Sequence, residues 1–178
     1  MILKTRRLCL RPLRQDDAQA LFAILGDSEA TRFWDRPAIA RAGTASEIVA
    51  SQLAAMEDGH FFYWTVWADD DAIGSVDLSG LDFLHKRGEI GFFFRRDRWG
   101  QGFAREAAEA LIGHAFGTLK LERLEARVHA ANRPAKTLLA RLGFLPEGRL
   151  TGHIRREGAR HDVDVFGLLS TSRSRNGT

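Results

Sequence analysis

The sequence contains a single cysteine, Cys9, among 178 residues. One cysteine excludes an internal disulfide framework and any zinc site built from several cysteines. Cys9 lies in the alternating stretch from Arg7 to Arg11, so we interpret it as a structural strand residue rather than a nucleophile. No apolar run approaches the ~20 residues of a membrane-spanning helix, and the N-terminus has no signal-peptide block. We therefore expect a cytoplasmic protein without a membrane partner.

The sequence also lacks a basic tract, an internal repeat and a low-complexity block. Its net charge is +3, but acidic and basic residues are interspersed along the chain, so a nucleic-acid partner is not expected. A hydrophobic content of 44% and a charged content of 28% are ordinary for a globular domain. The length predicts one domain, residues 1–169, followed by a polar tail, residues 170–178, that we expect to be disordered.

Hydrophobic periodicity predicts an α+β domain. Hairpins outnumber strand–helix–strand crossovers, which favours a mixed and largely antiparallel sheet. The expected strands are residues 5–13, 61–67, 72–78, 88–95, 124–129, 145–155 and a return strand through 163–168. The expected helices are residues 18–25, 44–57, 102–118 and a segment that ends at Gly143.

Two glycines, Gly100 and Gly102, stand between the strand at 88–95 and the helix at 102–118. A helix start offers about four unpaired backbone N–H groups, and small residues let an anion such as phosphate approach them. The dinucleotide pattern fails because Arg105 stands where a small residue is needed. The nucleotide-hydrolase pattern fails because Phe103 and Ala104 follow the last glycine. A tight turn that binds nothing is the alternative.

Two stretches resemble blocks of the GNAT acetyltransferases. Trp99-Gly100-Gln101-Gly102-Phe103-Ala104 is similar to the family's pyrophosphate loop, except that Trp99 replaces the usual first glutamine or arginine. The segment from Asn132 to Phe144 resembles the block in which an asparagine opens a helix closed by L-G-F. The run from Trp99 to Ala107 resembles the RimJ/RimL branch, the ribosomal-protein N-terminal acetyltransferases, in particular. This resemblance implies the GNAT fold, with about seven strands flanked by about four helices.

The resemblance implies an N-acetyltransferase that uses acetyl-CoA and no metal. The acceptor would be a primary amine, for which a protein N-terminus is one candidate, and the enzyme would be a monomer or homodimer. The strand at 88–95 would bind the pantetheine arm through its backbone, and the loop would bind the pyrophosphate. The residues implied to bind the cofactor are Phe92, Phe93, Phe94, Trp99, Gly100, Gln101, Gly102, Phe103, Ala104 and Asn132.

The resemblance also implies catalytic residues. An amine must lose a proton before attack, and Glu89, at the start of the strand beside the thioester, is our first choice of base. Asn132 would act on the pantetheine arm and is also suited to capping the following helix. Reserve candidates for the base are His85, His129 and Asp162. Ala135 replaces the family's serine, and the only tyrosine, Tyr63, is remote in sequence, so a general acid for the thiolate is not identified.

The acceptor is expected between the first helices and the last hairpin. Trp34 and Asp162 are the predicted substrate-binding residues, and Phe33, Arg155, Arg156 and His161 lie on the same segments. The alternatives are an acetyltransferase for a small amine such as an aminoglycoside, polyamine or amino acid, or a non-catalytic acyl-CoA-binding regulator. A ribosome-associated RNA-binding module is a third, and it would show strongly salt-dependent binding.

Overall fold

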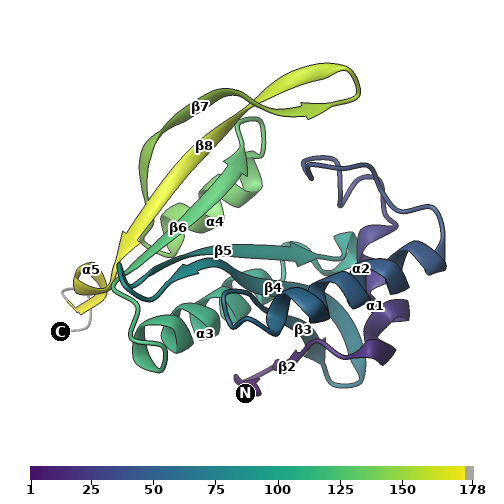
Figure 1. The fold of residues 1–178 in the computed structure, drawn as a ribbon, viewed down its shortest axis with the longest axis horizontal. Helices are drawn as coiled ribbons and strands as arrows, with labels where there is room; N and C mark the ends of the chain where they lie inside the picture. Colours follow the sequence, from purple (N-terminus) through teal and green to yellow (C-terminus); the bar gives the residue numbers. More distant parts are fainter. Residues whose placement is uncertain (175–178) are drawn as a thin grey trace.

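An eight-stranded mixed sheet runs through the computed structural model, which describes residues 1–174 (Figure 1). The strands are β1 (Leu3–Lys4), β2 (Cys9–Pro12), β3 (Phe62–Ala68), β4 (Asp71–Asp82), β5 (Arg87–Phe94), β6 (Arg123–His129), β7 (Leu145–Arg156) and β8 (Ala159–Leu169). The helices are η1 (Gln15–Asp17), α1 (Ala18–Leu25), α2 (Ala42–Met56), η2 (Arg96–Arg98), α3 (Phe103–Gly117), α4 (Arg133–Arg141) and α5 (Ser170–Ser174). The predicted tail thus begins as a short helix, and residues 175–178 lie outside the described part.

The strand order is β1-β2-β3-β4-β5-β6-β8-β7, and β5–β6 is the one parallel pair within residues 1–174. The prediction of a mixed, mostly antiparallel sheet is confirmed. The first strand was predicted over residues 5–13, but residues 5–8 form a turn in which the Thr5 N–H donates to the Leu8 carbonyl oxygen at 2.9 Å. Only β2 lies within the predicted range, and β1 precedes the turn. Cys9 begins β2, as its alternating surroundings indicate.

The two faces of the sheet carry separate cores, because successive strand residues point to opposite faces. Ile90 and Phe94 of β5 pack with α3 and α4 in the larger core. Tyr63 of β3 packs in the smaller core with α1 and α2, and Phe93 borders it. Residues 89, 91 and 93 therefore face the side of α1 and α2.

The sheet splits between β5 and β6. These strands pair over residues 87–89 and 123–125, and no strand within residues 1–174 pairs with the remainder of β5 on that side. Figure 1 shows them adjacent at one end and separating toward the end where the β7–β8 hairpin projects. The split exposes the backbone of β5 just before the glycine loop.

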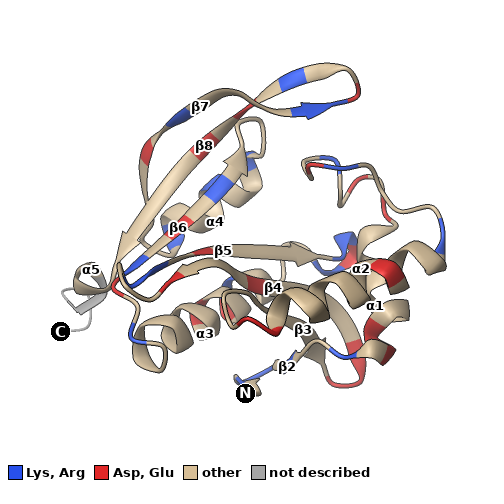
Figure 2. Ribbon diagram, in the orientation of Figure 1, with Lys and Arg blue, Asp and Glu red and all other residues tan. Residues whose placement is uncertain are grey.

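No helix within residues 1–174 is both long and apolar enough to cross a membrane. Figure 2 shows that acidic and basic residues share the same elements. Ion pairs of opposite charge, such as Arg127 with Glu89 and Arg149 with Asp164, accordingly occur within the sheet.

Candidate active site

The glycine loop has a backbone that non-glycine residues rarely adopt. Gly100 has φ +74° and Gly102 has φ +80°, and Gly102 is the N-cap of α3. The first helical bond of α3 is donated by the Glu106 N–H to the Gly102 carbonyl oxygen at 3.1 Å. Within the described chain, the six backbone N–H groups of residues 100–105 donate no hydrogen bond. They lie at the positive end of a 15-residue helix, which is a ready anion-binding arrangement.

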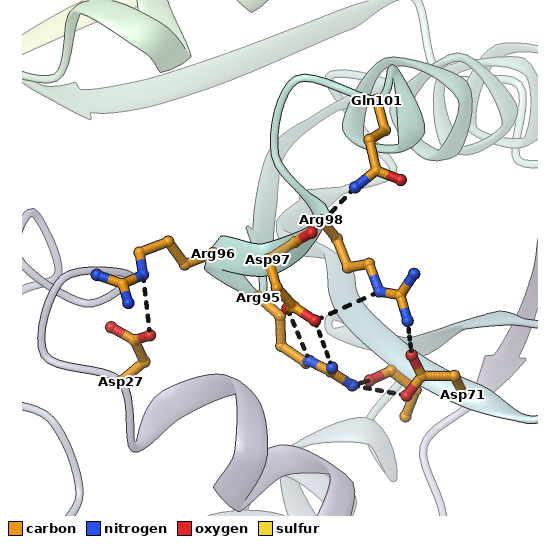
Figure 3. A network of polar contacts seen from close by, with 8 residues as sticks. Asp27, Asp71, Arg95, Arg96, Asp97, Arg98 and Gln101 are labelled. Atoms are coloured by element: carbon orange, nitrogen blue, oxygen red, sulfur yellow. Dashed lines mark hydrogen bonds and ion pairs between the residues drawn. The ribbon is translucent and has the colours of Figure 1, made fainter.

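A charged network supports the loop from below (Figure 3). Arg95 donates to Asp71 at 2.6 Å and to Asp97 at 2.7 Å, and Arg98 also pairs with Asp71. Gln101 donates through Nε2 to the Asp97 carbonyl oxygen at 2.9 Å. The segment between β5 and α3 is therefore fixed by its own side chains and by Asp71 of β4.

Trp99 anchors the same segment to the end of β5. Its indole Nε1 donates to the Phe94 carbonyl oxygen at 2.9 Å, while the side chain stays 46% exposed. Of the predicted cofactor residues, Trp99 and Gln101 thus use their side chains to brace the loop. The Gln101 N–H remains available to a ligand, whereas the Trp99 N–H donates to the Arg96 carbonyl oxygen at 3.2 Å.

A second contact fixes the start of α3. Glu106 accepts hydrogen bonds from Thr5 Oγ1 at 2.6 Å and from the Arg7 N–H at 2.9 Å, and it pairs with Arg7 Nε at 2.7 Å. The Arg7 guanidinium also stacks over the Phe103 ring, 4.4 Å from its centroid. The N-terminal segment therefore holds the first turn of α3 in place.

The free edge of β5 offers backbone groups beside the loop. The Arg95 N–H donates to the Ile73 carbonyl oxygen on β4, so by alternation the N–H groups of Phe92 and Phe94 point toward the split. The aromatic side chains of β5 are packed against the protein. Phe94 is buried, and Phe93 meets Trp34 edge-on with ring centroids 5.9 Å apart. The structure thus brings the predicted loop and the predicted strand edge together.

Glu89 lies where β5 and β6 begin to separate. Its Oε2 is 3.3 Å from Arg127 Nε, and its side chain is 31% exposed. Burial raises the pKa of Glu89, an effect that Arg127 opposes and Glu125 reinforces. Glu89 therefore stands at the mouth of the split with a cationic partner.

Asp77 was not among the predicted site residues. It pairs in register with Gly91 on β5 and Tyr63 on β3, on the same face as Glu89. Burial raises the pKa of Asp77 to about 7, and the charge of Glu89 adds to that rise. A signal was available in the sequence, because Asp77 is the one charged residue in the stretch Ala72 to Leu78, and a carboxylate is costly to bury there.

Asn132 is the N-cap of α4, and its Oδ1 accepts from the Ala135 N–H at 3.2 Å. The capping role is therefore present in the structure. Within residues 1–174 its Nδ2 donates no hydrogen bond, so it remains available for the predicted contact with pantetheine. Lys136 Nζ supports the same turn by donating to the Ala130 carbonyl oxygen at 2.6 Å.

The two predicted acceptor residues, Trp34 and Asp162, have different surroundings. Trp34 lies against Phe93 of β5, next to the split. Asp162 instead accepts a hydrogen bond from the Gly152 N–H at 2.8 Å, within the β7–β8 hairpin. The reserve base His85 lies in the β4–β5 turn, where its N–H donates to Asp82.

The hairpin reaches back to the loop between α1 and α2. Nη1 of Arg156 donates to the carbonyl oxygens of Thr31, Arg32 and Trp34, at 3.0, 2.6 and 3.2 Å. These contacts form a bridge over the side of the sheet that carries Glu89.

Three rings line the same bridge. His129 lies between His161 and Phe33, with ring centroids 5.0 and 5.3 Å away. Burial lowers the pKa of His129, and the nearby His161 and Arg156 lower it further. These effects favour the neutral form of His129, which ends β6.

Comparison with known proteins agrees with this geometry. The model of the acetyltransferase (GNAT) domain matches residues 7–145. The N-acetyltransferase p20 of Bacillus licheniformis is 33% identical over 94% of this chain and 95% of its own length. The spermidine N(1)-acetyltransferase of Escherichia coli K12 is 25% identical over 79% of this chain and 74% of its own length.

A solved structure shares the fold. RimL, the ribosomal L7/L12 alpha-N-protein acetyltransferase in complex with coenzyme A, superposes with a TM-score of 0.87 at 18% identity, over 95% of this chain and 98% of that one. GNAT enzymes use acyl-CoA, and the split sheet with a glycine loop at its end is where this chain could hold one. The chain therefore belongs to the GNAT family of N-acetyltransferases, with RimL among its structural neighbours.

Proposed function

We propose that this protein transfers the acetyl group of acetyl-CoA to a primary amine, with the N-terminal amine of a protein as the first candidate acceptor. The observation that carries the proposal is the run of six unpaired N–H groups at residues 100–105, next to the free edge of β5. Backbone donors at a helix start are suited to a pyrophosphate. A strand edge is suited to the amide-containing pantetheine arm, because it supplies donors and acceptors in register.

The Phe92 N–H supports the chemical step in this proposal. It points into the split, where the thioester carbonyl would lie if the arm follows β5. A backbone donor there would stabilise the oxyanion that develops during attack, and loss of such a donor costs about 3–4 kcal/mol in other enzymes.

No tyrosine acid is required for the thiolate to leave. Burial raises the pKa of Tyr63 well above its usual range, and its hydroxyl lies beside Ser75 and Gln52 in the core under α2. A thiol with an ordinary pKa of about 8.5 can leave as the thiolate near neutral pH. Ala135, at the family's serine position, is consistent with unassisted departure.

The Arg156 bridge supports an acceptor that enters end-on. It joins the hairpin to the α1–α2 loop at three carbonyl oxygens, so a chain terminus passes under it more readily than the middle of a folded segment. A polyamine is the second candidate. Asp77 and Glu89 on the floor of the site would attract a cationic chain, and the spermidine acetyltransferase is a sequence relative.

Calorimetric titration with acetyl-CoA tests the cofactor site, with NADH and ATP as controls. Asparagine and aspartate differ in charge but little in shape, and asparagine tolerates positive φ. Gly102→Asp should therefore abolish binding that Gly102→Asn only weakens, and Gly113→Asp, on the exposed side of the same helix, should leave binding intact. Folded protein that binds no acetyl-CoA would refute the proposal.

Thiol release then identifies the acceptor. Wild-type enzyme and acetyl-CoA are mixed with peptides that have free N-termini, with the same peptides blocked at the N-terminus, and with spermidine. Release that requires the free N-terminus supports the first candidate, and release with spermidine alone supports the second.

A further inference from the structure

The side chain of Asp77 reaches across the neighbouring strand. A Cβ on Gly91 would stand closer than 3.0 Å to Cγ and both oxygens of the Asp77 carboxyl group. The carboxylate therefore occupies the space above Gly91 that any other residue would fill. Gly91 precedes Phe92, whose N–H points into the split, so the carboxylate extends toward the place where the thioester and the amine would meet.

The two carboxylates on this floor differ in their partners. Glu89 pairs with Arg127 at the mouth of the split. Within residues 1–174, the Asp77 carboxylate accepts no hydrogen bond and forms no ion pair, although it lies among Tyr63, Gly91 and the smaller core. A half-buried carboxylate without a donor is a costly arrangement unless a cationic ligand completes it.

We propose that Asp77 is the residue that takes the proton from the acceptor ammonium, and that Glu89 passes this proton to solvent. This inference rests on the proposed transfer of acetyl groups to amines. It assigns the direct proton acceptor to β4, whereas the sequence pointed to Glu89 on β5.

The step balances as follows. The N–H bond of the ammonium breaks, and its proton moves to the Asp77 carboxylate. The freed electron pair forms the C–N bond to the thioester carbonyl carbon, and the C–S bond then breaks with its electrons on sulfur. A second proton leaves the new amide nitrogen and ends on the thiolate. The proton on Asp77 reaches solvent through Glu89, so each turnover releases one proton.

The proton affinity of Asp77 suits a general base. A base acts best when its pKa lies near the working pH, and burial together with the Glu89 charge raises the pKa of Asp77 to about 7. The groups around Asp77 are consistent with this. Tyr63 on β3 stays neutral because burial raises its pKa, and α2 contributes the uncharged Gln52. Arg127 and Glu125 of β6 and His153 of β7 act on Glu89.

Kinetics with the acceptor found by thiol release provide one test. Asp77→Asn should lower kcat/KM for the acceptor roughly 10²–10⁴-fold and remove the acidic limb of its pH profile, while acetyl-CoA binding stays unchanged. Glu89→Gln should move that limb to lower pH, because a negative charge beside Asp77 is gone. Asp82→Asn, at the far end of the same strand, is the matched control and should leave the profile unchanged. Wild-type kcat/KM in the Asp77 variant would overturn the proposal.

NMR of isotope-labelled aspartate provides a test that needs no acceptor. One aspartate carboxyl of the ligand-free enzyme should titrate near neutral pH, should be missing in Asp77→Asn, and should titrate at lower pH in Glu89→Gln. If all aspartates titrate in their ordinary acidic range, the inference is wrong even if the enzyme is active. If the enzyme does not bind acetyl-CoA but the neutral titration is present, the proposed function fails and the catalytic role of Asp77 fails with it, while the raised proton affinity of Asp77 stands.

Discussion

The carboxylate of Asp77 on β4 lies directly over Gly91, its antiparallel partner on β5, in space that a side chain at Gly91 would need. Side chains at the two positions therefore compete for the same space. The coupling links a charged residue of one strand to the backbone of the strand that borders the split.

Gly91→Ala should be harmful only when Asp77 is present. The added Cβ displaces the carboxylate, and overpacking of this kind costs about 1–3 kcal/mol of unfolding free energy. In an Asp77→Ser background the smaller side chain leaves room, so the same change should be close to neutral. A double-mutant cycle on urea unfolding and on kcat/KM measures the coupling, and strictly additive effects would contradict it.

Asp77 should also make stability depend on pH. Its pKa of about 7 in the folded state lies above the ordinary 3.8, so between these values the folded protein binds more protons than the unfolded chain. The unfolding free energy should therefore fall as pH rises from about 4 to about 7, by at most roughly 4 kcal/mol.

Asp77→Asn removes this dependence. The variant should be more stable than wild type at about pH 8 and should gain little at about pH 4, as measured by urea unfolding at both pH values. Asp70→Asn, at an exposed position in the β3–β4 turn, is the control. Equal pH dependence of wild type and the Asp77 variant would show that the carboxyl titrates normally.

Asp71→Ala should weaken acetyl-CoA binding indirectly, through the shape of the glycine loop. Asp71 accepts from both Arg95 and Arg98 below the glycine loop (Figure 3), and its loss removes one of the two carboxylates that hold these cations, which leaves Asp97 and loosens the loop. Hydrogen bonds to charged groups contribute about 1.5–3 kcal/mol, so we expect a loss of affinity of about tenfold or more.

Calorimetry measures that loss. Asp70→Ala, in the same turn but exposed, is the matched control and should bind as wild type does. Unchanged affinity in Asp71→Ala would show that the loop holds its shape without the network.

Arg156→Ala should raise the KM for the acceptor and leave acetyl-CoA binding unchanged. Its guanidinium joins the hairpin to the carbonyl oxygens of Thr31, Arg32 and Trp34, so its removal should free the α1–α2 loop next to the acceptor. Arg155→Ala, exposed on the neighbouring position, is the control. An increased KM for acetyl-CoA, with an unchanged KM for the acceptor, would show that the Arg156 contacts support the cofactor site and not the acceptor site.

Much of the fold could be read from local patterns. Aromatic and β-branched alternation marked β3 and β4, and an apolar stripe marked α3, because these patterns depend only on which face of an element is buried. Gly100 and Gly102 marked the loop because both need positive φ. The turn at Thr5–Leu8, which shortens the predicted first strand to β2, escaped the pattern, since a single turn bond within an alternating run leaves no periodic signal.

The sequence by itself determined the family, the sheet class and the glycine loop, since each depends on contiguous residues whose chemistry is visible in order. Tertiary structure alone decided that Asp77 lies over Gly91 within the electrostatic influence of Glu89, that Arg156 reaches residues 31–34, and that Trp99 and Gln101 brace the loop with their side chains. These contacts depend on strand register and on the packing of segments far apart in the chain. Neither strand register nor long-range packing can be deduced from one sequence. The sequence therefore identified the kind of site, and only the folded structure pointed to its proton acceptor.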